Sequence, residues 1–226
     1  KILEQNTTVD FVCSDHWVIN AKGEKEEEAT KENSAKWGKD KLSKGIIPDL
    51  LTETFLYQSL QVGSTLFRRE CLLEVGYMRP EADGCEDFDL LVRLALSGFT
   101  GYFIPELLME YRFHGGQTSL KQDIHFLSAK SFCLESYRFP DAELEKLRLK
   151  KLAVTQQALG LRLIEKGDVV KGRELLKQTT EVLGSSKKIK LGLILSYLPL
   201  NLRQFLLNIF RQTRQKDYSE KVRSIR

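Results

Sequence analysis

The chain has 226 residues, of which 42% are hydrophobic and 29% charged, and its formal net charge is +4. These values are typical of a globular protein that is long enough to bury a core. No run of about 18 apolar residues occurs, which excludes a conventional membrane-spanning helix. The four cysteines are scattered without a C-x-x-C spacing, so we predict neither a zinc site nor a disulfide scaffold, and a reducing cytosol is the expected compartment.

The charge is divided unevenly along the chain. Residues 1–120 carry a balance of −7, whereas residues 121–226 carry +11. This division indicates two regions with different roles, the second of which faces something anionic. The chain starts without Met, and its first residues lack the apolar segment of a signal peptide, so we expect it to be part of a longer protein.

The first half alternates short strands and helices. Residues 9–15 predict a buried strand that continues as extended chain through residue 20. Residues 24–45 are rich in Lys and Glu and predict a mobile surface loop. The later predicted elements are a helix over 46–60, a strand over 63–69, a helical turn over 70–75 that closes at Gly76, a helix over 86–97 that stops at Gly98, and extended segments at 102–104 and 107–111. This is a mixed α/β pattern.

From about residue 120 onward the pattern is helical. Residues 141–166 and 169–183 predict two helices that form an αα-hairpin. Residues 189–210 are strongly apolar but are interrupted by Pro199 and by polar side chains. Basic residues flank this stretch, so residues 187–216 fit a helix that lies in a membrane interface. The flanking basic residues are Lys187, Lys188, Lys190, Arg211, Arg214 and Lys216. Two alternatives remain open: a helix that packs on its own protein with a basic outer face, and a helix that binds a protein partner.

Four carboxylates crowd into residues 83–89, at the start of the helix predicted over 86–97. Asp83 and Glu86 fit a capping pattern, with Asp83 as N-cap and Glu86 at the third helical position. Asp87 would then lie in the first turn, where the helix dipole favours a negative charge. Capping explains Asp83 and Glu86, and a catalytic base is the other interpretation of the cluster.

Four passages, taken in chain order, carry a resemblance to a known family. They are residues 9–24, residues 63–77, the E-D-x-D-L-x-x-R-L segment at 86–94, and the Y-R-x-H segment at 111–114 with Thr118 and Ser119. In order and spacing the chain resembles the family 2 inverting glycosyltransferases of the GT-A fold. The resemblance implies that residues 1–119 are the acceptor-side half of a GT-A domain, a partial Rossmann-like α/β fold, and that an α-helical region follows over 120–226.

The resemblance also implies a mechanism. Asp87 takes the position of the general base, which removes a proton from an acceptor hydroxyl while that hydroxyl attacks the anomeric carbon of a nucleotide-sugar with inversion. Glu86 is expected to orient Asp87 or to accept hydrogen bonds from backbone N–H groups. The helix N-terminus is expected to keep Asp87 ionised and to make it a weaker base.

Other positions are implied to bind substrate. Arg112 and His114 are candidates to contact the donor diphosphate, and His114 is also a candidate to share in metal binding. Asp15 and Ser64 are further candidate substrate contacts. Arg93, in contrast, is expected to pair with a carboxylate or with the helix surface.

The family also uses Mn²⁺ or Mg²⁺, held by a D-x-D motif in an N-terminal nucleotide-binding half. No such motif precedes Val9, so the metal ligands are expected to lie outside this chain, and we expect the chain alone not to transfer sugar. The implied function is transfer from a nucleotide-sugar donor to a glycan or lipid-linked acceptor in surface polysaccharide synthesis, in the cytoplasm or at the inner face of the membrane.

The alternative is a non-catalytic protein. In that interpretation the chain is a truncated relic or an interaction module, which docks a partner or an anionic membrane through its basic helices. Nucleic-acid binding is disfavoured, because the basic residues lie on apolar helices without an interleaved aromatic stacking platform.

Overall fold

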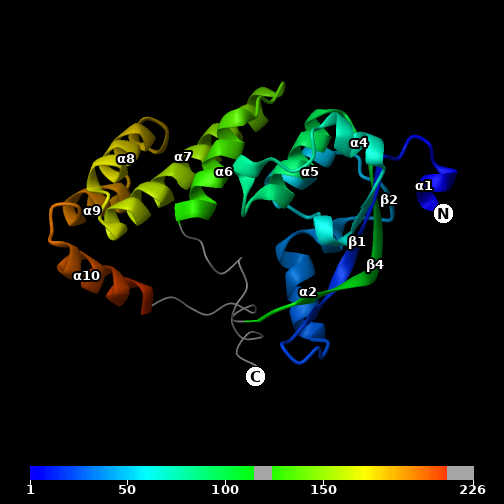
Figure 1. Ribbon diagram of the computed structural model, residues 1–226, viewed down its shortest axis with the longest axis horizontal. Coiled ribbons are helices and arrows are strands. Elements are labelled where there is room, and N and C mark those ends of the chain that lie inside the picture. Colours follow the sequence, from blue (N-terminus) through cyan, green and yellow to red (C-terminus); the bar gives the residue numbers. More distant parts are fainter. Residues whose placement is uncertain (115–123, 213–226) are drawn as a thin grey trace. The chain divides into compact units, whose positions relative to one another are not determined.

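Figure 1 shows the computed structural model, which describes residues 1–114 and 124–212. These residues divide into two compact units, each described here by itself. The first unit comprises residues 1–80 and 86–114, and the second comprises residues 81–85 and 124–212. The boundary predicted between residues 119 and 120 lies outside the described residues, as do Thr118 and Ser119.

The first unit is built on a mixed four-stranded sheet in the order β2-β4-β1-β3. The two long strands, β1 (Phe11–Ile19) and β4 (Gly101–Arg112), pair in parallel at its centre. The edge strands β3 (Thr65–Phe67) and β2 (Gly45–Ile46) pair antiparallel with β1 and β4, respectively. The predicted mixed α/β class is confirmed, and the extended segments predicted on either side of residue 105 form one continuous strand.

Parallel pairing brings the carboxyl ends of β1 and β4 to the same edge of the sheet. Ile19 lies opposite Arg112, and the Phe113 N–H donates to the Ile19 carbonyl at 2.8 Å. Ligands of parallel α/β sheets bind outside the carboxyl ends of the strands. This edge is therefore where the chemistry of the first unit is expected.

Two helices of the first unit close its core. Helices α4 (Arg69–Glu74) and α5 (Glu86–Leu96) end near glycines with left-handed backbone, Gly76 at φ 75° and Gly98 at φ 80°, as predicted. The core cluster joins helix residues to the strands, and it contains Phe11, Cys13, Ile47, Leu50, Leu60, Cys71, Leu90, Leu91, Leu94 and Phe103. Helix α5 packs on the amino-terminal halves of β1 and β4, because its Leu90, Leu91 and Leu94 join the same core cluster as residues at the start of both strands.

The prediction of a mobile loop over residues 24–45 is wrong. Helix α2 (Glu27–Lys36) and the short 3-10 helix η1 (Lys39–Lys41) occupy this segment. Helix α2 buries small residues, and the Thr30 Oγ1 accepts a hydrogen bond from the Val18 N–H of β1 at 3.0 Å. Because the buried face of α2 is narrow and made of small and polar side chains, the sequence shows little apolar periodicity there. The helix is therefore stabilised mainly by its tertiary contacts.

The helix predicted over residues 46–60 is present only in part. Its start is taken by strand β2, and a helical segment follows as α3 (Leu50–Thr52) and the π-helical turn η2 (Glu53–Tyr57). The segment ends at Gln58, whose backbone is left-handed at φ 53°. Pairing with β4 therefore overrides the helical spacing at the amino end.

The second unit is helical, with α6 (Ile124–Ser136), α7 (Ala142–Lys166) and α8 (Val169–Leu183). The predicted αα-hairpin of α7 and α8 is confirmed, and Gly167 closes α7 at φ 107°. The helices approach closely where glycines face each other, because a Cβ built on Gly172 would lie 2.7 Å from the Gly160 carbonyl oxygen.

The apolar stretch near the end of the described chain forms two helices. These are α9 (Lys187–Leu195) and α10 (Leu200–Gln212), and Pro199 lies in the connection between them. Within residues 1–114 and 124–212, no helix is long and apolar enough to cross a bilayer. Arg214 and Lys216 of the predicted interface helix lie beyond residue 212 and outside the described residues.

Candidate active site at the start of helix α5

Helix α5 begins at Glu86, so the capping prediction is wrong. Asp83 lies three residues before the helix, and its exposed carboxylate contacts His125 Nε2 at 2.9 Å. Gly84 adopts φ 86°, and the Cys85 N–H donates to the Ala82 carbonyl at 2.7 Å. This turn makes Glu86 the first residue of the helix and keeps Asp83 out of the N-cap position.

The first turn of α5 carries two carboxylates, Glu86 and Asp87, that pair with none of the described cations. Neither Glu86 nor Asp87 forms an ion pair within the described part of the chain, and the buried Glu86 Oε2 has no hydrogen-bond partner there. A buried acceptor without a donor costs roughly 1–3 kcal/mol, so such a group calls for a functional explanation.

The pKa of Asp87 is raised above its ordinary value. The larger cause is desolvation by the surrounding protein, and the second is the negative charge of Glu86. This direction is opposite to the expectation that the helix N-terminus makes Asp87 a weaker base. A carboxylate with a raised pKa is a stronger base when it is ionised, which suits proton abstraction.

Asp89, two residues after Asp87, is completely buried, and two arginines compensate its negative charge. The Arg79 and Arg93 side chains donate to its carboxylate, with Nε contacts of 2.9 and 2.8 Å, respectively. Arg93 also donates to the backbone carbonyls of Val75 and Tyr77. The prediction that Arg93 pairs with a carboxylate is confirmed, and the cluster holds α5 against the segment that precedes it.

Asp15 is buried among donors of the protein itself. Its Oδ1 accepts from the His16 N–H at 2.8 Å and from Lys39 Nζ at 3.2 Å, and its Oδ2 accepts from Ser34 Oγ at 2.9 Å. These contacts occupy both oxygens, so the geometry does not support Asp15 as a substrate contact. Its role in this arrangement is to compensate a buried lysine.

His16 completes this cluster in an unusual protonation state. Its Nδ1 lies 2.9 Å from Lys39 Nζ, so the ring proton belongs on Nε2, which is buried without a partner in the described residues. Burial first, and the Lys39 charge second, lower the pKa of His16 to about 4. His16 is therefore neutral at pH 7 and is held between Lys39 and the ring of Tyr111.

Arg112 lies at the carboxyl end of β4, at the sheet edge described above. Its Nη1 donates to the carbonyls of Asn20 and Ala21, both at 3.1 Å, and so ties β4 to the turn after β1. Gly23 in the same turn adopts φ 91°, and a Cβ built there would lie 3.4 Å from Arg112 Nη1. Exposed His114 follows two residues later, and these two basic side chains belong to the same edge.

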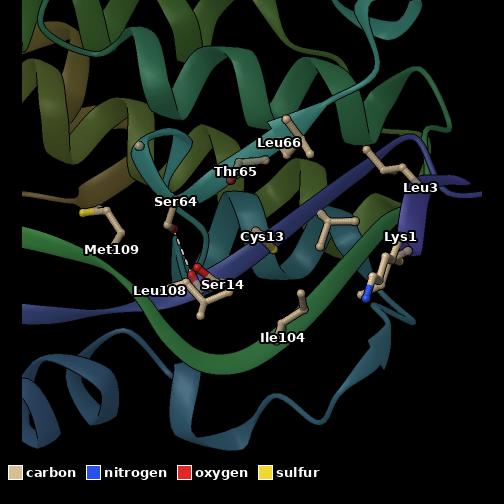
Figure 2. Close-up of a pocket in the computed structure, with 13 residues that line it drawn as sticks. Lys1, Leu3, Cys13, Ser14, Ser64, Thr65, Leu66, Ile104, Leu108 and Met109 are labelled. Carbon is tan, nitrogen blue, oxygen red and sulfur yellow. Dashed lines mark hydrogen bonds between the residues drawn. The ribbon is translucent and has the colours of Figure 1, made fainter.

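Ser64 lines a pocket of about 500 Å³ rather than a polar binding site (Figure 2). Its hydroxyl contacts the Ser14 carbonyl at 2.8 Å and the Gln61 carbonyl at 3.2 Å, so it ties the start of β3 to β1. The side chains that line the pocket are mostly aliphatic and include Ile2, Leu3, Val12, Leu66, Ile104, Leu108 and Met109. Such a lining does not suit a sugar, and Ser64 is structurally engaged.

Sequence reasoning missed Arg79 and Lys39, the cations that neutralise Asp89 and Asp15. Arg79 lies in a loop segment and Lys39 in a charged stretch, so neither position carries a periodic signal. Sequence periodicity reveals side-chain pairs that lie three or four residues apart on one helix. It does not reveal pairs such as these, whose members are ten or more residues apart and do not share a helix.

The described residues do not supply a metal site. No group of three or more His, Cys, Asp or Glu side chains capable of holding an ion occurs within 1–114 and 124–212. The buried carboxylate of Asp15 already forms an ion pair with the Lys39 ammonium. The residues in hand therefore do not fit the divalent ion that the resemblance implies, and no chemical step is derived through one.

In comparisons with known proteins, no protein-family model, no curated protein and no solved structure matches the chain.

Proposed function

We propose that the first unit is the acceptor-side part of an inverting glycosyltransferase of the GT-A fold, with Asp87 as its general base. One observation carries the proposal. Three carboxylates lie within four residues of α5, yet two arginines neutralise Asp89, whereas Glu86 and Asp87 form no ion pair among residues 1–114 and 124–212 and the pKa of Asp87 is raised. A structural role explains Asp89 and leaves the other two unexplained.

In the proposed reaction, Asp87 accepts the proton of an acceptor hydroxyl. The hydroxyl oxygen forms a bond to the anomeric carbon of a nucleotide-sugar, and the bond from that carbon to the diphosphate breaks on the opposite face. The electron pair leaves with the nucleotide diphosphate, and the configuration inverts. Glu86 contributes by raising the pKa of Asp87.

The placement of the basic residues supports a donor site near the same edge. Arg112 ends β4 at the carboxyl edge of the parallel strands, and the exposed His114 follows two residues later. Guanidinium and imidazolium groups stabilise the charge that develops on a departing diphosphate. A glycan or lipid-linked acceptor and a nucleotide-sugar donor are therefore the proposed substrates, with surface polysaccharide synthesis at the cytosolic face of the membrane as the setting.

Asp87→Asn in the full-length protein is the decisive variant. We expect sugar transfer from a panel of nucleotide-sugars to fall by about 10²–10⁴-fold, because the amide cannot take the proton. The free energy of unfolding should stay the same or rise slightly, because the fold disfavours the charged form of Asp87. In the parent protein, transfer should be lost on acidification at a pH above the ordinary pKa of an aspartate, since only the ionised form is a base.

Asp83→Asn is the matched control, because this exposed carboxylate lies close by in sequence and outside helix α5. Its transfer rate should equal that of the parent. Equal activity of Asp87→Asn and the parent would refute the proposal and leave the non-catalytic interaction module as the explanation of the chain.

A further inference from the structure

Helix α9 has an inner face that is fixed to the rest of the second unit. Ile189 and Leu195 are buried, and Gly192 between them packs so closely that a Cβ there would lie 2.4 Å from Leu161 Cδ2 and 2.9 Å from Leu176 Cδ1. Helix α10 is fixed in turn by buried Arg203, which donates to the Leu195 and Ile164 carbonyls. Packing on the protein itself, one of the open alternatives, therefore accounts for one face of these helices.

The opposite face is apolar and exposed. Ile194 is 64% exposed, Tyr197 77% and Phe205 61%, and Leu191 and Leu202 are exposed as well. These five residues, called here the apolar ridge, recur at three-residue spacing along α9 into its C-terminal turn and again on α10. Large side chains gathered in this way mark a docking surface rather than ordinary surface.

The charged side chains of α9 and α10 themselves have a single sign. Lys187, Lys188 and Lys190 are exposed in the first turn of α9, and no Asp or Glu occurs from residue 184 to residue 212. Cations at a helix N-terminus oppose the helix dipole, so these lysines do not stabilise α9. Their position is explained by an anionic surface next to the ridge.

Tyr197 is held in place for such a contact. The Arg173 guanidinium lies 4.0 Å from the centre of the Tyr197 ring, and Arg173 Nε donates to Ser196 Oγ at 2.7 Å. The ring is thus positioned by the protein while most of its surface stays exposed. Tyrosine with aliphatic neighbours and lysines is the composition found at the boundary between lipid headgroups and acyl chains.

We propose that the outer face of α9 and α10 binds the surface of an anionic lipid bilayer. The apolar ridge enters the headgroup region, and Lys187, Lys188 and Lys190 contact lipid phosphates. An acidic protein partner is less well matched, because four of the five ridge side chains are purely apolar and only the Tyr197 hydroxyl can form directional hydrogen bonds. This proposal concerns the second unit and does not rest on the proposed transferase function.

The test measures binding of the full chain to vesicles of phosphatidylcholine alone and of phosphatidylcholine with phosphatidylglycerol. We expect co-sedimentation with the anionic vesicles only, and loss of binding at high salt. Replacing Lys187, Lys188 and Lys190 together by Gln should lower the partition coefficient about 100-fold, since each lysine near an anionic surface contributes roughly fivefold. The control replaces exposed Lys146, Lys150 and Lys177 by Gln, with the same change in net charge and no expected loss.

A fluorescent label reports whether the ridge itself enters the bilayer. The four native cysteines are buried, so Ile194→Cys provides a reactive site for an environment-sensitive dye. We expect a several-fold rise in its emission with anionic vesicles, and no rise for the control Val170→Cys, whose parent side chain is 77% exposed on α8.

Three results would overturn the proposal. They are equal binding to neutral and anionic vesicles, equal loss in the two lysine variants, and a label at position 194 that does not respond to bound vesicles. Dimerisation in solution that Ile194→Ser and Phe205→Ser abolish, without any vesicle binding, would assign the ridge to a second copy of the chain instead. The readout uses no transferase activity, so its failure is distinct from failure of the proposed function.

Discussion

Two regions of the first unit gather carboxylates, one at the buried Asp15 of β1 and one at the half-buried Glu86 and exposed Asp87 of α5, and they differ in how the charge is compensated. In the middle of β1, Asp15 receives donors from Lys39, Ser34 and the backbone of His16. At the start of α5, Glu86 and Asp87 are consecutive residues, and neither forms an ion pair in the part of the chain that the structure describes. The first arrangement neutralises its carboxylate, whereas the second holds two carboxylates that form no ion pair among the described residues.

The comparison shows that clustering of acids is not by itself evidence of catalysis. What distinguishes a reactive carboxylate from a structural one is the presence of compensating charge. Asp89 makes the point within a single helix, because it lies two residues from Asp87 and yet is fully paired with Arg79 and Arg93. The following variants test whether a compensating cation identifies the structural carboxylates correctly.

The largest effect is expected at Asp89. Replacement by Asn removes the charge that neutralises two largely buried guanidinium groups, so we expect a loss of about 5 kcal/mol in the free energy of unfolding. Urea unfolding followed by circular dichroism measures it, with Asp83→Asn as the exposed control. A loss no larger than that of the control would show that compensation at Asp89 is not structural.

A somewhat smaller effect is expected from Lys39→Met, which leaves Asp15 buried without its cation. We expect a loss of about 4 kcal/mol, because an unpaired buried charge remains. The double variant Asp15→Asn with Lys39→Met should recover a large part of that loss, since neither charge is then present. A double variant that is as unstable as the sum of the two single variants would argue against a coupled pair.

The third prediction concerns pH and His16. The folded protein keeps this ring neutral down to a pKa of about 4, whereas the unfolded chain binds a proton near pH 6.5. The unfolded state therefore gains protons first as the pH falls, and the free energy of unfolding should decrease between pH 6.5 and pH 4, by about 3 kcal/mol at most.

His16→Gln removes this contribution. The free energy of unfolding of the parent should therefore fall more steeply than that of the variant as the pH is lowered from 6.5 to 4. Asp15 and Lys39 face the ring in both proteins and cancel in the difference to first order. Parallel stability profiles for the two proteins would contradict a neutral buried His16.

Much of the first unit follows from local pattern. The buried strand at β1, the stop signals at Gly76 and Gly98, and the apolar stripe of α5 are properties of short segments, and the structure confirms each. Helix α2 escaped prediction because its buried face consists of small and polar residues such as Ala29 and Thr30, which make sense only against β1. The cap assigned to Asp83 failed because the left-handed turn at Gly84 shifts the helix start.

The sequence alone determined the order of the elements, the αα-hairpin of α7 and α8, and the identity of the carboxylate cluster, because periodicity, glycine stops and composition are local. Only the tertiary structure decided which acids are neutralised. Arg79 reaches Asp89 across ten residues and Lys39 reaches Asp15 across 24, and desolvation raises the pKa of Asp87 through atoms that the chain assembles from separate segments. Charge compensation depends on distance in space, which no local pattern records.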